Sequence, residues 1–523
     1  MRRREFISGL ASTAALAGAA APSWNAGQVT HILPTAADRR FLIKVSFGQK
    51  QERAPFLKVG NKLTAGARSD RGGLFWSFDV SQLQPAHPYE LQLLASTKKP
   101  LCDPWTLKTL PDPNDRPANF RLLVYTCAGG DPDQLSPKGK LNYLSQAQRG
   151  MLLDRGLSYQ PDAVIANGDH IYWDLRQGTY PPKLSPSQLA NTGKFVRNQP
   201  VLGTPNEDLL RKVGDAQITD LYKTRLRGVP VFFLQDDHDY FENDDADEKM
   251  VTFPPDHFML QLARATRRLY YPEFLPDAAR PAGLPGASAA DTALGTAESF
   301  GTLRFGQLAE LLLYDCRRYL TLAGPNAVIV PPDVESWITA RLADRAVTHS
   351  VQIPSMPPGW SAGKWGDWYP DILASDGSLT IKKEKPYWQS GWAAQHDRLL
   401  QAASAQRTKI PLIISGDMHS IAEGRITRCG AIDMRANPVI SLLPGPLGTG
   451  QSWPSSARGV RAVPPHHLAM EEKLPCLEEN GFMIVDFLPA KINVKFFRWS
   501  PTLGDQSISS LAPFRETQID RPS

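Results

Sequence analysis

The segment Ala163-Val164-Ile165-Ala166-Asn167-Gly168-Asp169-His170-Ile171-Tyr172 decides the fold assignment. It begins as a short apolar run with the length and branched residues of a buried strand, and polar residues follow at once. Long irregular or helical pieces separate this run from others of the same kind, which predicts an α/β domain. The other runs are Arg121 to Thr126, Val231 to Leu234, Leu311 to Tyr314 and Pro411 to Ser415.

Chemically reactive side chains follow these five predicted strands. In an open α/β sheet, ligands bind beyond the carboxyl ends of the strands, so the following residues form the candidate site. They are Cys127 after the first run, Asp169 with Tyr172, Asp237 with His238, Asp315 with Arg317, and Asp417 with His419. Their side chains are typical metal ligands and proton donors, so we predict a metal centre.

Asp169 and Tyr172 lie three residues apart, which allows a tight bend to turn both toward one point. A tyrosine ligand must lose a proton with a pKa of about 10. A trivalent ion such as Fe³⁺ achieves this more readily than a divalent ion. The alternative is a structural pair, with Asp169 capping a helix and Tyr172 packed as a ring.

The other strand ends supply a thiol, carboxylates and imidazoles. Residues two apart on an extended segment share a face, so Asp417 and His419 are expected to point the same way. Adjacent Asp237 and His238 are expected to point oppositely, one toward a metal and the other toward substrate as a proton donor. This argument does not decide which of Asp237 and His238 binds the metal and which faces the substrate.

Cys127 is either a buried structural thiol or a ligand. A thiolate and a phenolate both favour trivalent iron, whereas the carboxylates of Asp169, Asp237 and Asp417 suit Ca²⁺, Mg²⁺ or Mn²⁺. We therefore expect two unlike metals bridged by Asp169.

Composition and the amino terminus indicate an exported globular protein. The 523 residues carry a net charge of +5, which is spread along the chain and argues against a nucleic-acid partner. The start, with Arg3-Arg4-Glu5-Phe6-Ile7 and an Ala-rich run, resembles a twin-arginine signal and predicts export to the periplasm or medium. No stretch is apolar enough for a stable membrane span. Four of the five cysteines could form two disulfides.

Three regions are predicted: an export signal at 1–26, a β-sandwich at 27–110 and a catalytic domain at 118–510. Short alternating strands from Arg40 to Leu94 indicate the sandwich, and the spacing of Leu83, Pro85 and Tyr89 resembles a tyrosine corner. A closing β-hairpin is expected at Phe482 to Phe497. The polar, Pro- and Gly-rich inserts Arg176 to Gly228, Phe253 to Phe300 and Gly359 to Trp392 are predicted to be surface loops and lids.

The ordered motifs resemble the alkaline phosphatase D family of calcineurin-like metallophosphoesterases, over about Phe41 to Trp499. The motifs are Cys127, Gly168-Asp169-x-x-Tyr172, Asp236-Asp237-His238, Asp315-x-Arg317-x-Tyr319 and Ser415-Gly416-Asp417-x-His419. The resemblance implies a four-layer α/β/β/α sandwich behind an immunoglobulin- or fibronectin-like β-sandwich. It also implies Fe³⁺ held by Cys127, Asp169, Tyr172 and His419, with Ca²⁺-type ions near Asp169, Asp237 and Asp417. The chain departs from the family at Asp239, where glutamate is usual, and at His170.

The expected reaction is hydrolysis of phosphate esters by attack of a metal-bound hydroxide on phosphorus. His238 is expected to protonate the leaving oxygen, and Arg317 to bind a phosphate oxygen unless it forms a surface salt bridge. Three alternatives stay open: a phospholipase D-like phosphodiesterase, a non-catalytic binder of phosphorylated envelope polymers, and a cysteine hydrolase built on Cys127.

Overall fold

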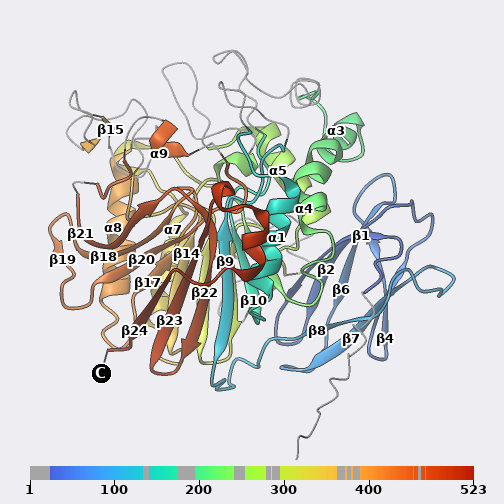
Figure 1. Ribbon diagram of the computed structural model, residues 1–523, viewed down its shortest axis with the longest axis horizontal. Helices are drawn as coiled ribbons and strands as arrows, with labels where there is room; N and C mark the ends of the chain where they lie inside the picture. The colour runs from blue at the N-terminus through green and yellow to red at the C-terminus, as the bar shows by residue number, and fades with distance from the viewer. Residues whose placement is uncertain are drawn as a thin grey trace, which may run out of the picture.

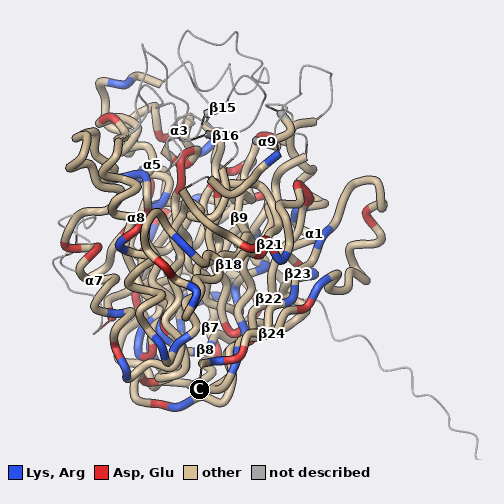
Figure 2. Tube along the Cα trace, turned by 90° about the vertical axis from the view of Figure 1, so that its left-hand side faces the viewer, with Lys and Arg blue, Asp and Glu red and all other residues tan. Residues whose placement is uncertain are grey.

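The computed structural model describes most of the chain after the predicted export signal. The described residues are 24–132, 141–173, 195–240, 254–277, 284, 295–361, 372–373, 379–380, 389–450, 453–457, 461–465 and 467–522. Residues 1–23 of the predicted signal therefore lie outside them. Among the described residues, no helix combines the length and apolarity needed to cross a membrane. Lysine and arginine are interspersed with aspartate and glutamate along the trace (Figure 2), as the sequence predicted.

The amino-terminal region consists of strands in two four-stranded sheets, shown in blue in Figure 1. One sheet has the order β1-β2-β6-β5, with bounds Val29–Ala36, Phe41–Phe47, Phe75–Val80 and Ala67–Arg68. The other has the order β4-β3-β7-β8, with bounds Lys62–Ala65, Phe56–Val59, Pro88–Leu94 and Trp105–Lys108. The phenol oxygen of Tyr89 accepts a hydrogen bond from the Gln84 amide at 2.7 Å, which confirms the predicted clip.

The remaining chain is a mixed α/β structure built on two larger sheets (Figure 1). The six-stranded sheet has the order β11-β10-β9-β22-β23-β24. Strands β9, β10 and β11 are parallel, and β22 to β24 continue the sheet in antiparallel fashion. The predicted hairpin is confirmed as β22 and β23, and β24 was not predicted. The bounds in sheet order are Val231–Leu234, Ala163–Asn167, Phe120–Thr126, Asn480–Leu488, Lys491–Trp499 and Arg515–Asp520.

The eight-stranded sheet has the order β12-β13-β14-β17-β20-β18-β19, and β21 pairs with β18. Strands β13, β14, β17 and β20 are parallel. The strands predicted at Leu311 to Tyr314 and Pro411 to Ser415 are confirmed as β13 and β17. The bounds in sheet order, with β21 last, are Phe300–Phe305, Ala309–Tyr314, His349–Pro354, Leu412–Ile414, Val439–Pro444, Ile421–Cys429, Ile432–Asp433 and Leu468–Leu477.

Alternation along the strands divides the core between the two faces of each sheet. In β9, Leu122 and Val124 join a cluster that also contains Leu313 and Ile414 of the other sheet. Leu123 and Tyr125 point the other way and pack with helices. Helices α1 (Gln146–Leu157), α3 (Pro205–Gly214), α4 (Asp220–Tyr222) and α5 (His257–Tyr270) belong to this second cluster. Helices α7 (Pro332–Ala343) and α8 (Ser390–Ser404) pack on the eight-stranded sheet.

The prediction that the polar inserts are surface loops was wrong where their described parts form helices. The first contains α3 and α4, and the second contains α5, whose Leu262 and Leu269 are fully or almost fully buried. Apolar residues at helical spacing form one buried face, whereas the average composition of the segment is polar. In the third insert, Trp392 is buried on α8. Parts of the inserts lie outside the described residues: 176–194 in the first, 253, 278–283 and 285–294 in the second, and 362–371, 374–378 and 381–388 in the third.

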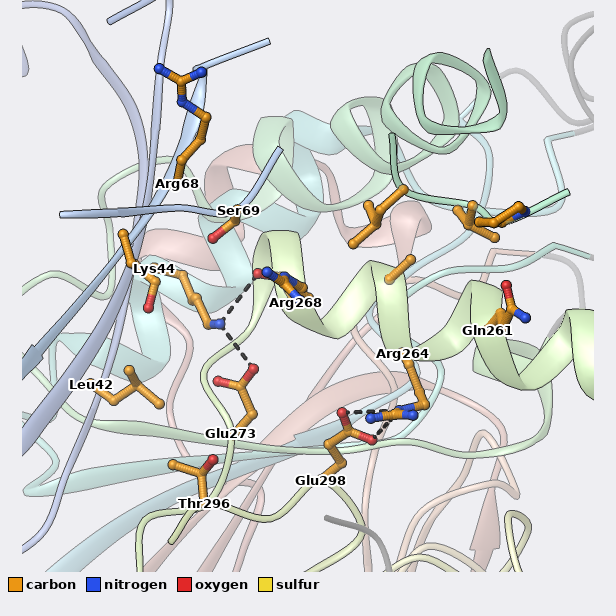
Figure 3. A pocket seen from close by; sticks show the side chains of 16 residues that line it. Leu42, Lys44, Arg68, Ser69, Gln261, Arg264, Arg268, Glu273, Thr296 and Glu298 are labelled. Atoms are coloured by element: carbon orange, nitrogen blue, oxygen red, sulfur yellow. Dashed lines mark hydrogen bonds and ion pairs between the residues drawn. The ribbon is translucent and has the colours of Figure 1, made fainter. Parts of the chain in front are cut away.

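The amino-terminal strands contact the α/β region through a buried ion pair. Lys44 on β2 donates to Glu273 at 2.9 Å and to the Arg268 carbonyl at 3.2 Å. Figure 3 shows both contacts beside a cavity of about 550 Å³, with Arg264 and Glu298 paired on its other side. Both Lys44 and Glu273 are largely buried, so each charge depends on the other.

Replacing Lys44 with Met is expected to lower the free energy of unfolding by about 3 kcal/mol, because it leaves the Glu273 carboxylate buried without its cation. The Lys44→Met, Glu273→Gln double variant should lose less, since no buried charge is left over. Urea denaturation measures both. Lys50→Met breaks an exposed pair with Glu52 and is the control, with an expected loss under about 1 kcal/mol. Equal losses in the Lys44 and Lys50 variants would contradict this account.

Candidate metal centre

The predicted ligands meet at the carboxyl ends of parallel strands from both larger sheets. Cys127 directly follows β9, and Asp169 comes two residues after β10 ends at Asn167. Asp237 opens a 3-10 helix, η2 (Asp237–Tyr240), after β11, and Asp417 and His419 follow β17. All of these side chains are buried. The sheets therefore assemble the site that the strand ends predicted.

Four of these residues adopt a left-handed backbone conformation. The φ angles are 47° at Cys127, 55° at Asp169, 70° at Asp417 and 48° at His419. Such conformations cost non-glycine residues about 1–3 kcal/mol each and persist where the surrounding fold imposes them. The prediction that Asp417 and His419 share one face of an extended segment was therefore wrong. Both side chains still reach the site, because two sharp backbone turns redirect them to different ligand clusters.

Glycines allow the loops of the site to approach one another closely. A Cβ added to Gly448 would lie 2.3 Å from the Gly129 carbonyl oxygen, and one added to Gly416 would lie 2.6 Å from the Asn167 carbonyl oxygen. Both contacts are to backbone atoms, which cannot rotate away. The absence of a side chain at these positions therefore brings the loop after β17 and the loop after β20 against those after β9 and β10.

One ligand cluster contains Cys127, Asp169 and His419, whose ligand atoms all lie within 4.8 Å of one another. Tyr172 belongs to the same group: its hydroxyl donates to Asp169 Oδ2 at 3.0 Å and lies 2.9 Å from His419 Nε2. The two residues predicted to share a point after β10 thus do so. The donor set comprises a thiol, a phenol, a carboxylate and an imidazole.

Two further clusters adjoin the first. Asp169, Asp237 and His238 form one, and Asp236, Asp237 and Asp417 form the other. Asp169 is thus shared with the thiol-containing cluster, and Asp237 joins the two carboxylate-rich ones. The prediction that Asp237 and His238 point oppositely was wrong, because both lie in the 3-10 helix η2 rather than in a strand. His238 stacks near Tyr172, with ring centroids 4.0 Å apart.

Arg317 lies inside the site, so the alternative of a surface salt bridge was wrong. Its Nε donates to Asp236 Oδ1 at 2.7 Å, and an Nη atom lies 3.5 Å from Asp417 Oδ1. The side chain is 1% exposed. Asp236 was missed as a site residue, although its place beside Asp237 and His238 is a signal visible in the sequence.

The buried acidic groups would lose their protons readily only beside positive charge. Burial, with the nearby Asp169 carboxylate, raises the pKa of the Cys127 thiol and of the Tyr172 phenol. Burial also raises the pKa of Asp236, despite Arg317. Asp169 Oδ1 and Asp236 Oδ2 are buried without a hydrogen-bond partner among the described residues. Cations bound here would satisfy these oxygens and favour the deprotonated ligands, so the residues fit a metal centre.

Polar residues that the sequence analysis missed support the ligands from behind. Asp239 accepts hydrogen bonds from the amides of Asp169 at 2.8 Å and His170 at 2.9 Å, which holds the loop after β10. Gln217 accepts from the Tyr172 amide at 2.8 Å. Asp239, seen only as a departure from the family pattern, thus has a structural role. Gln217 lies in a predicted loop and carried no signal in the sequence.

Thr449→Val is expected to weaken metal binding about 10- to 100-fold while the fold is retained. The Thr449 hydroxyl lies 3.0 Å from His419 Nδ1 and orients the ring, and valine has nearly the same shape without the hydroxyl. Dialysis against graded chelator, followed by metal analysis, measures the change. Thr266→Val is the matched control, since it removes an equally buried hydroxyl that bonds Leu262 within α5. Equal metal retention in both variants would contradict the orienting role.

Comparison with known proteins supports the same kind of site. The model of the PhoD-like phosphatase family matches residues 137–496. No curated protein matches the sequence. Among solved structures, the chain is similar to one titled "Structure of PhoD", with a TM-score of 0.60 and 12% identity over 97% of this chain and 92% of that one. It is also similar to the purple acid phosphatase PPD1 from yellow lupin (Lupinus luteus) seeds. There the TM-score is 0.55 and the identity 11%, over 95% of this chain and 75% of that one.

Proposed function

Since this chain belongs to the PhoD-like phosphatase family and is a metallophosphoesterase, we propose that it hydrolyses phosphate esters at the centre around Asp169. The observation that carries the proposal is the sharing of Asp169 between two ligand clusters of different chemistry. One cluster contributes a thiol and adjoins a phenol, and the other contributes carboxylate and imidazole. Two unlike ions bridged by one carboxylate would fit this arrangement.

We propose that Cys127, Asp169, Tyr172 and His419 hold Fe³⁺. Thiolate and phenolate ligands support this choice, because a trivalent ion best stabilises both deprotonated groups. Asp169, Asp237 and Asp417 would hold a divalent ion, Ca²⁺ by preference or Mg²⁺ or Mn²⁺, and Asp236 lies within the same carboxylate group. When bound, the ions supply an activated water and neutralise charge on the phosphoryl oxygens.

The chain's own residues would then orient the ester and transfer a proton. His238 is proposed to donate a proton to the leaving oxygen. Its side chain is 10% exposed, more than the buried Asp237 beside it, so it lies where a bound ester could meet it. Arg317 is proposed to hold Asp236 and Asp417 in place and to add positive charge beside the phosphate.

The finer features of the fold and location belong to the same proposal. We infer a four-layer α/β/β/α catalytic domain at 118–510, supported by helical clusters on the outer face of each large sheet, and a separate β-sandwich domain at 27–110. We also propose export by the twin-arginine machinery to the periplasm or medium, supported by Arg3 and Arg4.

The testing experiment is metal analysis of the purified protein, with its visible spectrum and its hydrolysis of matched aryl phosphate monoesters and diesters. We expect iron with a phenolate-to-iron(III) absorption band that Tyr172→Phe removes. The ratio of the two rates then assigns phosphatase or phosphodiesterase preference. Metal-free protein that still cleaves either ester would overturn the metal proposal and favour the Cys127 hydrolase. Metal-bound protein inert toward both esters would favour the binding role.

A further inference from the structure

A second group of metal-ligand side chains lies outside the centre described above. His396 and Asp397 are on α8, and Cys429 is the last residue of β18. Their ligand atoms all lie within 4.8 Å of one another. His467, which directly precedes β21, contacts one member of this group: its Nε2 lies 2.8 Å from Asp397 Oδ2. The same Nε2 also lies 3.0 Å from Asp397 Oδ1, the oxygen to which Cys429 Sγ donates at 2.6 Å.

This cluster is distant from the Asp169 centre. Strand β18 begins at Ile421, two residues after His419, and ends at Cys429. A strand advances about 3.3 Å per residue, so Cys429 lies roughly 26 Å from the start of β18. The two groups therefore lie near opposite ends of one strand, and a single ion cannot serve both.

We propose that Cys429, His396, His467 and Asp397 form a structural zinc site. One thiolate, two imidazoles and one carboxylate are four ligands of the kinds that Zn²⁺ takes in tetrahedral sites. The carboxylate-rich part of the Asp169 centre suits harder ions, whereas sulfur and nitrogen ligands favour Zn²⁺. The two groups, which lie near opposite ends of β18, would thus favour different metals through their donor atoms.

The backbone around the cluster is already organised for binding. Cys429 is paired with Leu468 across the β18–β21 ladder, and the Gly430 amide donates to the His467 carbonyl at 2.9 Å. A Cβ added to Gly430 would lie 2.8 Å from His467 Cε1, so glycine makes room for the imidazole. These contacts position Cys429 and His467 before an ion binds. The loss of conformational entropy on binding is therefore smaller.

Two residues of the cluster are buried and two are partly exposed, which would allow an ion to enter and be retained. Cys429 and His396 are buried, whereas the side chains of Asp397 and His467 are 20% and 25% exposed. An ion could therefore enter past Asp397 and His467 and be held by the two inner ligands. Bound zinc would join α8 to the β18–β21 edge of the eight-stranded sheet and stabilise that contact. The alternative to a zinc site is a network without metal, in which hydrogen bonds alone join the thiol, the carboxylate and the imidazole.

The test measures zinc and iron in the full-length protein after growth with added Zn²⁺, for the wild type and for Cys429→Ser and His467→Asn. We expect one zinc per chain in the wild type, its loss in both variants, and unchanged iron. Cys102→Ser is the matched control, because it replaces another buried cysteine, in the connection between β7 and β8. His467 is partly exposed, so His467→Asn keeps the test usable if Cys429→Ser fails to fold.

Cobalt substitution provides a second readout that is independent of activity. Co²⁺ in this site should give a thiolate-to-cobalt absorption band that is lost in Cys429→Ser and kept in Cys127→Ser, which separates this site from the Asp169 centre. Zinc-free wild-type protein, or zinc retained in both the Cys429 and His467 variants, would overturn the proposal and leave the hydrogen-bonded network. Iron-free wild-type protein that still holds its zinc would count against the Asp169 centre alone.

Discussion

Asp169→Asn is expected to lower phosphate-ester hydrolysis by more than about 10³-fold and to remove both kinds of bound metal. The residue belongs to two ligand clusters, so losing its charge weakens both sites together. Removing a single donor to a transition-state charge already costs about 10²- to 10³-fold, and a shared ligand should cost more. Asparagine tolerates the left-handed φ of 55° found here and can accept the hydrogen bond from Tyr172. The fold should therefore survive.

Metal content per chain and kcat for an aryl phosphate check this prediction, and thermal unfolding confirms that the variant is folded. Asp433→Asn makes the same chemical change at an exposed ion pair with Arg435, remote from the site, and should leave metal content and rate unchanged. A folded Asp169→Asn protein that keeps both metals and its rate would remove Asp169 from the proposed centre.

His238→Asn is expected to lower kcat about 10²- to 10⁴-fold for alkyl phosphates, with metal content unchanged. An alkoxide leaves poorly without a proton, so these substrates depend on the acid. An aryl phosphate with an acidic phenol needs little protonation and should lose far less. The comparison of kcat across leaving groups therefore measures proton donation itself, and not a general disturbance of the site.

The position of His238 leaves a second role that this experiment separates from the first. Its ring lies in a ligand cluster with Asp169 and Asp237, so it could instead bind a metal ion. In that case the variant would lose metal, and its rate would fall equally for good and poor leaving groups. His257→Asn, at the exposed start of α5, controls for loss of an imidazole elsewhere.

The proposed zinc site changes how the five cysteines are interpreted. None of the five is in a disulfide, so neither of the two disulfides that the count allowed is formed. Cys127 and Cys429 instead lie in two separate groups of metal ligands. A thiol held among imidazole and carboxylate groups suggests metal binding more strongly than the cysteine count, which contains no information about neighbours.

The strands that carry the predicted ligands could be predicted because buried parallel strands are short, apolar and followed at once by polar residues. This local pattern located the ends of β9, β10, β11 and β17 within a residue or two, and with them every predicted ligand. The helices in the polar inserts were missed because their apolar face is diluted by the rest of the segment. Polarity averaged over a segment hides a periodic face.

The sequence alone therefore indicated most of the side chains of the Asp169 centre and the strand ends at which they would gather. Only the tertiary structure decided how they are grouped: Asp169 shared between clusters, Arg317 between two aspartates, and Cys429 beside His467. The expectation that residues two apart share one face was wrong for Asp417 and His419, because backbone turns with positive φ redirect their side chains. Gly416, directly before the first of these turns, lies against the Asn167 carbonyl at the end of β10. The grouping of the ligands is set by contacts between segments that are distant in the sequence. Local periodicity contains no information about such contacts, so it could not predict the grouping.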